Sequence, residues 1–256
     1  MKLSEIYAVI DGVAPFSISR EYCDKLGFYD NSGLLVDCGN EIKSVLFSLD
    51  CSMRSAEKAK ELGVDLLVTH HPAIFQPIKA LRADSPVTEC AKNGISILSA
   101  HLNLDSAEGG IDDCLAAALG ASGKAKRMHV LTDGGYGSVF SVKKTPLTEF
   151  VNRAKKVLNT ERVVVYGGGD VNKVASFCGA GMDEKSIAFA LCEGADTLVS
   201  SDPKHHLIAQ AVEHGLNVII LTHYAAENYG FRAFYQTIKE KCPLVTMHFF
   251  ADERLM

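Results

Sequence analysis

Several features that mark particular classes of protein are absent from this sequence of 256 residues. It has no tryptophan, its 26 basic residues do not outnumber its 31 acidic ones, and no apolar run approaches the roughly 18 residues that span a bilayer. The charges form no block of one sign, so there is no basic field for a nucleic-acid backbone. Charged residues among the first five interrupt any secretory signal. We therefore expect a soluble cytoplasmic protein that binds neither nucleic acid nor a membrane.

The eight cysteines contain no C-x-x-C pair and are scattered among apolar neighbours. This distribution favours small buried side chains over disulfides or thiolate metal ligands. Hydrophobic residues make up 47% of the chain, which is enough for a large core, and the length allows one large domain or two modest ones. The composition therefore predicts a globular fold without a soft-metal cysteine site.

Residues 63–72 have the sequence GVDLLVTHHP, in which a short apolar run is followed by two histidines and a proline. The apolar run 66–68 is too short for a helix and too apolar for a surface loop, so it predicts a buried parallel strand. Pro72 ends the strand because it has no N–H to donate. His70 and His71 then lie at the carboxyl end of the strand, where α/β folds bind ligands. A single adjacent pair would more often be structural, with one histidine buried and one exposed.

Alternating helical and extended patterns run along the whole chain. Helices are expected over 3–14, 19–26, 53–62, 86–93, 111–119, 146–158, 183–193, 203–213 and 224–242. Strands are expected over 33–36, 45–49, 66–68, 95–98, 136–142, 161–166, 171–177, 198–199, 218–221 and 244–250. Turn residues at 39–40 and 167–169 suggest that the strands on either side of each turn form hairpins.

The two halves of the chain, 1–128 and 129–256, repeat each other. The segment 63–72 resembles 194–203, which reads GADTLVSSDP. Each segment is preceded by a strand and a helix, and each is followed by a helix and a second strand that ends in a histidine and an acidic residue four positions on. The sequence therefore predicts an α/β fold of two similar halves with mixed sheets covered by helices, and a cleft between the halves.

We expect six imidazole and carboxylate side chains to lie together in that cleft. They are those of His70, His71, His101, Asp105, His223 and Glu227. This donor set suits Zn, Fe, Mn or Co. Six groups exceed the three protein ligands of a single catalytic zinc, so we expect two divalent metal ions, with Glu227 as the bridging carboxylate. Such a pair activates a shared water as hydroxide, which predicts hydrolytic chemistry.

Each of these motifs also has a simpler explanation. A histidine and an acidic residue four positions apart can form an ordinary pair on a helix face. Asp202 can cap a helix, and this leaves Lys204, His205 and His206 without an assigned role. His129, His214 and His248 are typical of surface or structural histidines, and the loop 178–181, CGAG, fits either an anion site or a tight turn. The recurrence of two such pairs in a duplicated fold, together with the His-His-Pro sequence, favours metal binding.

Three motifs together resemble the NIF-three-like family, which is usually labelled GTP cyclohydrolase 1 type 2 homolog. They are DLLVTHHPAIF at 65–75, HLNLDSAEGG at 101–110 and HYAAE at 223–227, and YDNSGL at 29–34 and CGAG at 178–181 extend the resemblance over nearly the whole chain. The resemblance implies a dinuclear metal centre and a toroidal homohexamer. Carried over by residue, it implies that the metal ligands are His70, His71, Asp105, His223 and Glu227, with His101 as a proton-transfer group or a support for the ligands.

The sequence departs from the family pattern at positions that bear on the substrate. An arginine common near 135–140 is missing, and Leu102, Thr222 and Ala226 replace residues that are common in the family motifs. None of these is a ligand. Three functions follow as hypotheses: a hydrolase that opens the ring of a purine nucleotide such as GTP, a phosphoesterase, and a non-catalytic metal-binding hexamer. Lys204 is the only basic residue expected near the cleft, which weakens the GTP hypothesis because a triphosphate normally requires cations.

Overall fold

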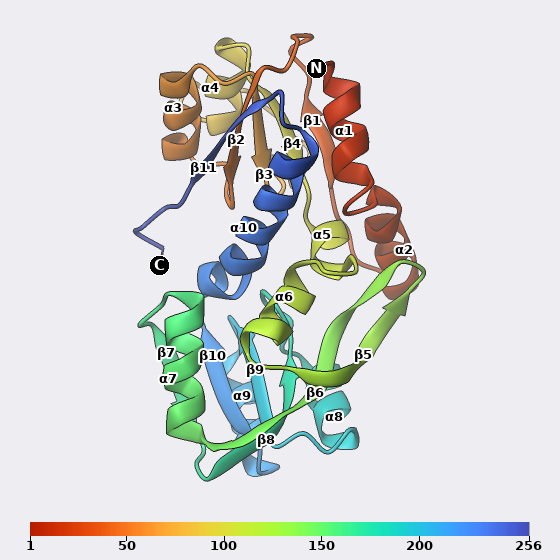
Figure 1. Cartoon of the computed structure of the whole chain (residues 1–256), viewed down its shortest axis with the longest axis vertical. Coiled ribbons are helices and arrows are strands. Elements are labelled where there is room, and N and C mark those ends of the chain that lie inside the picture. The colour runs from red at the N-terminus through yellow and green to blue at the C-terminus, as the bar shows by residue number, and fades with distance from the viewer. Residues whose placement is uncertain (256) are drawn as a thin grey trace. The chain divides into compact units, whose positions relative to one another are not determined.

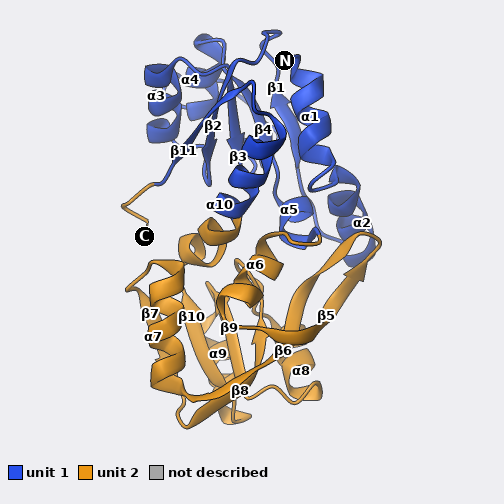
Figure 2. Ribbon diagram, viewed as in Figure 1, with its two compact units in different colours: residues 1–107, 231–251 blue, residues 108–230, 252–256 orange. Residues whose placement is uncertain are grey.

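The computed structural model describes residues 1–255 and contains two compact units. Unit 1 comprises 1–107 and 231–251, and unit 2 comprises 108–230 and the residues from 252 onward (Figure 2). The halves expected from the sequence, 1–128 and 129–256, divide the chain at a single point. The compact units instead interleave, because the chain returns to unit 1 within one long helix after Gly230.

Unit 1 is built on a five-stranded sheet in the order β1-β4-β3-β2-β11 (Figure 1). Its strands are β1 (Gly33–Val36), β2 (Ser44–Ser48), β3 (Leu66–Thr69), β4 (Ser96–Ser99) and β11 (Thr246–Phe250). Its helices are α1 (Leu3–Asp11), α2 (Phe16–Leu26), α3 (Met53–Leu62), α4 (Pro86–Lys92), α5 (Leu102–Ser106) and the later part of α10 (His223–Lys241). Neighbouring strands are parallel except β1, which is antiparallel to β4.

Helices cover both faces of this sheet. The aligned side chains of Leu46, Leu67 and Ile97 form a buried cluster with residues of α3 and α4. Phe47, one residue further along β2, points to the opposite face because side chains alternate along a strand. There it contacts the rings of Phe231, Phe234 and Tyr235 on α10. The sheet is therefore buried on both sides, as its nearly continuous apolar strands predict.

Unit 2 is built on a six-stranded sheet in the order β5-β6-β8-β9-β10-β7. Its strands are β5 (Ser122–Leu131), β6 (Gly134–Pro146), β7 (Val163–Tyr166), β8 (Asp170–Ser176), β9 (Thr197–Ser201) and β10 (Asn217–Leu221). Its helices are α6 (Ile111–Ala118), α7 (Leu147–Leu158), α8 (Glu184–Cys192), α9 (His205–Glu213) and the first part of α10. Ala175, Leu198 and Val218 are buried here with residues of α8 and α9.

The strand orders confirm the prediction of two similar α/β halves with mixed sheets. The series β1-β4-β3-β2 in unit 1 matches β7-β10-β9-β8 in unit 2, with three parallel strands and one antiparallel strand in each series. The predicted hairpins are wrong in both halves. β1 and β7 each skip the strand that follows in sequence and pair with the last strand of their repeat. The sequence also gave no indication of β5.

The repeated Gly-x-Asp sequence has a structural role in both units. Gly63 and Gly194 end α3 and α8 with positive φ angles of 61° and 68°, and this left-handed conformation is accessible to glycine at little cost. The carboxylates that follow hold the neighbouring strand: Asp65 accepts hydrogen bonds from the N–H groups of residues 43 and 44, and Asp196 accepts them from those of 172 and 173. The repeated sequence thus corresponds to repeated hydrogen bonds between an aspartate side chain and the backbone of the neighbouring strand.

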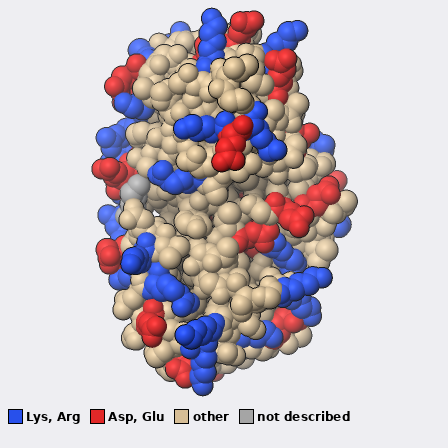
Figure 3. All heavy atoms as spheres, viewed as in Figure 1, with Lys and Arg blue, Asp and Glu red and all other residues tan. Residues whose placement is uncertain are grey.

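The cysteines and the surface charges were predicted with mixed success. Cys90, Cys178 and Cys242 are buried, but Cys192 is exposed and the other four are partly exposed, and all eight are free thiols. Acidic and basic side chains are interspersed over the face seen in Figure 3, in agreement with the sequence. Within residues 1–255, none of the helices has both the length and the apolar character needed to cross a membrane.

Candidate metal centre

Three histidines lie together at one edge of the unit 1 sheet. His70 and His71 follow β3, and His101 follows β4, so the two parallel neighbouring strands deliver all three side chains to the same edge. One ring nitrogen from each histidine lies within 4.8 Å of the others. The ring centroid of His70 is 4.8 Å from that of His71 and 5.2 Å from that of His101. The structure therefore brings together the histidines that the sequence placed at strand ends.

Asp105 joins this group from α5. Its Oδ1 lies 3.4 Å from Nε2 of His70, and both side chains are almost completely buried. His101 is the residue that precedes α5, so the histidine and the carboxylate are held by the start and the first turn of one short helix. A buried imidazole beside a buried carboxylate is a costly arrangement in an apolar core, and it is common where a metal ion binds.

Every histidine of this group has its Nδ1 held by an oxygen atom. Nδ1 of His71 lies 2.7 Å from Asp50, Nδ1 of His101 lies 2.8 Å from Asp30, and Nδ1 of His70 lies 2.8 Å from the carbonyl oxygen of Ala100. Because a carboxylate or carbonyl oxygen can only accept, each Nδ1 carries the hydrogen in a neutral ring. The lone pair of each ring is then on Nε2. Metal-binding histidines in proteins are typically oriented by such oxygen acceptors.

Asp30 is the most strongly held of these acceptors. Its side chain is completely buried, and besides His101 it accepts hydrogen bonds of 2.5 Å from the hydroxyls of Ser19 and Ser32. Burial alone would raise the pKa of this carboxyl group, but the hydrogen bonds from His101, Ser19 and Ser32 lower it to about 2. Asp30 is therefore a permanent anion at neutral pH, and it fixes the ring orientation of His101.

Unit 2 contains a histidine and carboxylate pair of its own. His223 is the first residue of α10, and its Nε2 lies 3.0 Å from Oε1 of Glu227, which is 2% exposed. Its Nδ1 lies 2.6 Å from the carboxylate of Asp202, so the pattern seen in unit 1 recurs. Asp202 has a positive φ of 50°, which is unusual for a residue with a side chain. It does not cap a helix, because α9 begins only at His205 with Lys204 as the capping position.

Two details of the sequence prediction need correction here. Glu227 lies in the second turn of α10 rather than the first, because the helix begins at His223 itself. The two histidine-acid pairs are also not at equivalent positions. Thr222 accepts the first hydrogen bonds of α10 with its hydroxyl and carbonyl oxygens, so Thr222, and not His223, corresponds to His101 at the start of α5.

The loop 178–181 is shaped around Glu227. Gly179 has a φ of 58°, and a Cβ atom placed on it would collide with Oε1 of Glu227 and lie 3.5 Å from the ring of His223. The carbonyl oxygen of Gly179 accepts hydrogen bonds from Ser200 and Ser201. These contacts favour the tight-turn interpretation of the loop: glycine is required because the backbone lies directly against the carboxylate.

A buried acidic network supports this loop from below. Asp112 on α6 accepts hydrogen bonds from the N–H of Cys178, the hydroxyl of Ser138 and the guanidinium of Arg127, which also pairs with Asp113. Burial raises the pKa of Asp112 to about 7, although Arg127 and the hydrogen bonds from Cys178 and Ser138 act in the opposite direction. This network could not be predicted from the sequence, because its members are far apart along the chain.

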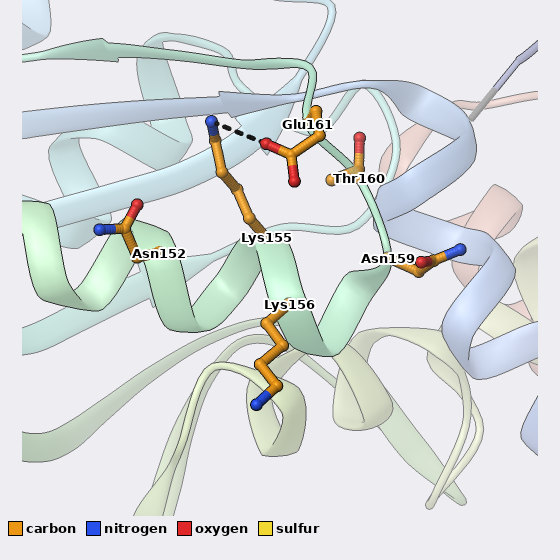
Figure 4. A pocket seen from close by; sticks show the side chains of 6 residues that line it. All are labelled: Asn152, Lys155, Lys156, Asn159, Thr160 and Glu161. Carbon is orange, nitrogen blue, oxygen red and sulfur yellow. Dashed lines mark hydrogen bonds and ion pairs between the residues drawn. The ribbon is translucent and has the colours of Figure 1, made fainter.

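The remaining histidines lie outside these groups. His205 and His206 are exposed, and His206 lies 3.8 Å from Glu184. His214, the residue after α9, lies 2.7 Å through its Nδ1 from the carbonyl oxygen of Gln210. None of the candidate ligands lines the open depression of about 400 Å³ beside the end of α7 (Figure 4). It is bordered by Lys155, Lys156 and four polar residues, and Lys155 is already paired with Glu161.

The chain is similar to known proteins over nearly its whole length. The model of the family described as Duf34/NIF3 (NGG1p interacting factor 3) matches residues 1–254. The chain belongs to the Duf34/NIF3 family. Proteins named GTP cyclohydrolase 1 type 2 homolog from Clostridium perfringens and Methanocaldococcus jannaschii are each 32% identical to it. The alignments cover 89% of this chain and 87% of the first relative, and 95% of this chain and 97% of the second.

Solved structures agree with this family membership. Reduced HcgD from Methanocaldococcus jannaschii has a TM-score of 0.83 at 30% identity, over 98% of both chains. A Bacillus cereus protein related to NIF3 has the same TM-score at 21% identity, over 98% of this chain and 96% of that one, and this likeness shows the fold. The resemblance noted in the sequence is therefore confirmed. Within the Duf34/NIF3 fold, imidazole and carboxylate groups that could hold a metal ion lie at the strand ends.

Proposed function

We propose that this Duf34/NIF3 protein is a metal-dependent hydrolase of the GTP cyclohydrolase 1 type 2 homolog kind. The observation that carries the proposal is the shared arrangement of its four candidate histidines. In each, Nδ1 is held by an oxygen acceptor, which fixes the ring and leaves Nε2 as the atom proposed for metal binding or proton transfer. An oxygen acceptor that orients the ring is typical of metal-binding histidines, and here it recurs at all three proposed histidine ligands and at His101.

The proposed ligands form two sets. His70, His71 and Asp105 come from unit 1, and His223 and Glu227 come from unit 2. Imidazole and carboxylate donors of this kind fit Zn, Fe, Mn or Co, and five protein ligands are more than one catalytic ion usually takes, so we propose two divalent ions. The second set lies on α10, the helix within which the chain passes from unit 2 back to unit 1.

The residues around these ligands have separable tasks. Bound divalent metal ions would supply a water molecule activated for attack on an electrophilic carbon or phosphorus atom. Asp50 and Asp202 orient the imidazoles of His71 and His223. His101 is proposed as the proton-transfer residue, because its side chain is 20% exposed and Asp30 holds its Nδ1, so that Nε2 is the atom that takes and returns a proton.

The substrate is proposed to be a nucleotide or a phosphoester. A triphosphate such as that of GTP normally requires lysine or arginine contacts. Lys204, the basic residue expected from the sequence, is exposed at the start of α9. The carboxylates that orient three of the histidines also make this environment acidic, which favours a substrate with fewer charges than a triphosphate. A metal-binding protein without catalysis is the second candidate, and the same acidic environment supports it.

We also propose that the chain assembles as a toroidal homohexamer, as the family resemblance implies. Native mass spectrometry of the purified protein tests this directly. Six copies are the expected result, and a monomer at all concentrations measured would contradict the assembly. The metal proposal does not depend on this outcome.

The metal proposal is tested by elemental analysis of protein purified without chelator. We expect about two equivalents of divalent metal per chain, falling to about one or none in Glu227→Gln and in Asp105→Asn. Glu161→Gln is the matched control, because that side chain is 92% exposed and its ion pair is with Lys155. Metal content below about half an equivalent after loading with Zn, Mn or Fe(II) would overturn the proposal.

Catalysis is tested on the loaded protein with GTP, guanosine monophosphate and simple phosphoesters. Turnover that depends on added metal and is lost in Glu227→Gln, but not in Glu161→Gln, supports the hydrolase. Full metal occupancy without turnover of any of these compounds would favour the non-catalytic candidate.

A further inference from the structure

Two exposed aromatic rings lie directly beside the histidine group of unit 1. Phe75 is 45% exposed, and its ring is 6.4 Å from that of His101 at an interplanar angle of 84°. Tyr29 is 53% exposed, and its ring is 5.8 Å from that of Phe75 at 88°. The three rings thus form a continuous series of edge-to-face contacts that leads from solvent to His101. Large aromatic side chains are usually buried, so this exposure is informative.

Hydrogen bonds hold the two ring-bearing segments together. Asn31, two residues after Tyr29, donates a hydrogen bond of 2.6 Å to the carbonyl oxygen of Ile74, the residue before Phe75. Asp30, which lies between Tyr29 and Asn31 in the chain, hydrogen-bonds Nδ1 of His101. The main chains that carry Tyr29 and Phe75 are therefore fixed to each other and to the histidine group. The rings are exposed on an ordered frame, and this is what distinguishes them from an apolar side chain at the tip of a loose loop.

We propose that Tyr29 and Phe75 form a binding platform for a planar aromatic ring of the substrate. The platform suits a heteroaromatic base, because an exposed aromatic ring binds any π-system by stacking. This inference rests on the proposed function, since it assigns the ring-binding part of the same site. It also fits the scarcity of basic residues, because stacking supplies affinity that does not depend on phosphate contacts.

The position of the platform explains what it would do. A base stacked on Phe75 lies within one ring contact of His101, so the reacting part of the substrate is brought next to the proton-transfer residue. Binding energy from a ring that does not itself react is then used to orient the part that does. Tyr29 and Phe75 are therefore binding residues, and His101 remains the residue at the chemistry.

The absence of tryptophan from the chain allows a direct test. Phe75→Trp introduces a single tryptophan at the platform, and Leu244→Trp introduces one at a position that is 92% exposed elsewhere in unit 1. Each protein is titrated, with chelator present, with guanosine monophosphate and with ribose 5-phosphate, which lacks the base. We expect saturable quenching of Phe75→Trp by the nucleotide alone and no saturable change in Leu244→Trp.

Removal of the second ring sharpens the test. Tyr29→Ala in the Phe75→Trp protein should raise the nucleotide concentration needed for half-saturation by roughly 10- to 100-fold. Equal quenching of both tryptophan variants, or no difference between nucleotide and sugar phosphate, would overturn the proposal. So would a blue-shifted emission of Phe75→Trp that changes on dilution, because the ring would then be covered by a second copy of the chain.

The outcome is separable from that of the proposed function, because binding is measured without metal and hydrolysis with it. Saturable quenching without turnover keeps the platform and removes the hydrolase. Metal-dependent turnover without quenching keeps the hydrolase and removes the platform.

Discussion

The Nδ1 atom of His101 lies 2.8 Å from Oδ1 of Asp30, a carboxylate with no exposed surface. Both hydroxyls that contact the other oxygen of Asp30 donate to it. Asp30 is held in place by these hydroxyls, and it holds the ring of His101 in one orientation. The direction in which Nε2 of His101 points is therefore fixed as well.

Replacement of Asp30 by asparagine should disturb this orientation without a change in side-chain size. The amide carries no charge, and it presents an NH2 group either to His101, whose Nδ1 must then accept, or to Ser19 and Ser32, whose hydroxyls must then change from donors to acceptors. We expect metal-dependent turnover to fall roughly 10- to 100-fold. The nitrogen chemical shifts of His101 should show a mixture of tautomers. Asp84→Asn, at a side chain 71% exposed in the same unit, is the control, and an unchanged kcat in the Asp30 variant would contradict the assignment of His101.

Asp202 combines an unusual backbone angle with a contact to His223, and two substitutions separate the contributions. Asparagine tolerates a positive φ, so Asp202→Asn should leave the free energy of unfolding nearly unchanged while weakening metal binding by about tenfold or more. Asp202→Ala should weaken binding similarly and also destabilise the fold by about 1 kcal/mol. Competition with a fluorescent chelator measures the affinity, and urea titration measures the stability. If Asp202→Asn binds metal as tightly as the wild type, the carboxylate has no role in orienting His223.

Gly179→Ala tests whether the loop 178–181 shapes the position of Glu227. Gly194→Ala is the matched control, because Gly194 has a similar φ of 68° but open space where a Cβ would be, whereas a Cβ on Gly179 collides with Glu227. Both variants should lose about 1 kcal/mol of stability from backbone strain. Only Gly179→Ala should also lose metal, measured as equivalents per chain. Equal metal content in the two variants would show that Glu227 moves aside at no cost to the site.

Asp112 should make stability depend on pH in a direction opposite to that of most carboxylates. Its pKa is raised from 3.8 to about 7 by burial, so between these values the folded state binds a proton that the unfolded state has released. The contribution of Asp112 to the free energy of unfolding must therefore fall as pH rises from about 4 to about 7, and stay constant above that. Urea unfolding at about pH 5 and about pH 8 compares the wild type with Asp112→Asn. The wild type should lose more stability than the variant, at a rate of up to about 1.4 kcal/mol per pH unit, and parallel behaviour of the two proteins would contradict it.

Features that depend on neighbouring residues in the chain were predicted from the sequence, whereas contacts between distant residues were missed. His70, His71 and His101 were placed correctly because each follows an apolar strand, and adjacent parallel strands end at one edge. Asp30 and Asp50 were missed as their partners, because hydrogen bonds to residues 101 and 71 leave no mark in local spacing.

Strand pairing shows the same limit. The ranges of β1 and β7 were predicted well, but the turn residues that follow each suggested a hairpin with the next strand. The actual partners, β4 and β10, are the last strands of their repeats, and the preference for them arises only when the whole sheet is assembled. Likewise, the start of α10 at His223 was misplaced because Thr222, which caps the helix, resembles the end of the preceding strand.

The return of the chain to unit 1 has a consequence for synthesis on the ribosome. β11 is the partner of β2 at the edge of the unit 1 sheet, yet it lies at residues 246–250, after all of the unit 2 strands. Until those residues emerge, β2 has an unpaired edge, and its apolar face also lacks Phe231, Phe234 and Tyr235. Exposed strand edges of this kind promote aggregation of nascent chains. The sheet of the first unit is therefore completed only after every strand of the second unit has been synthesised.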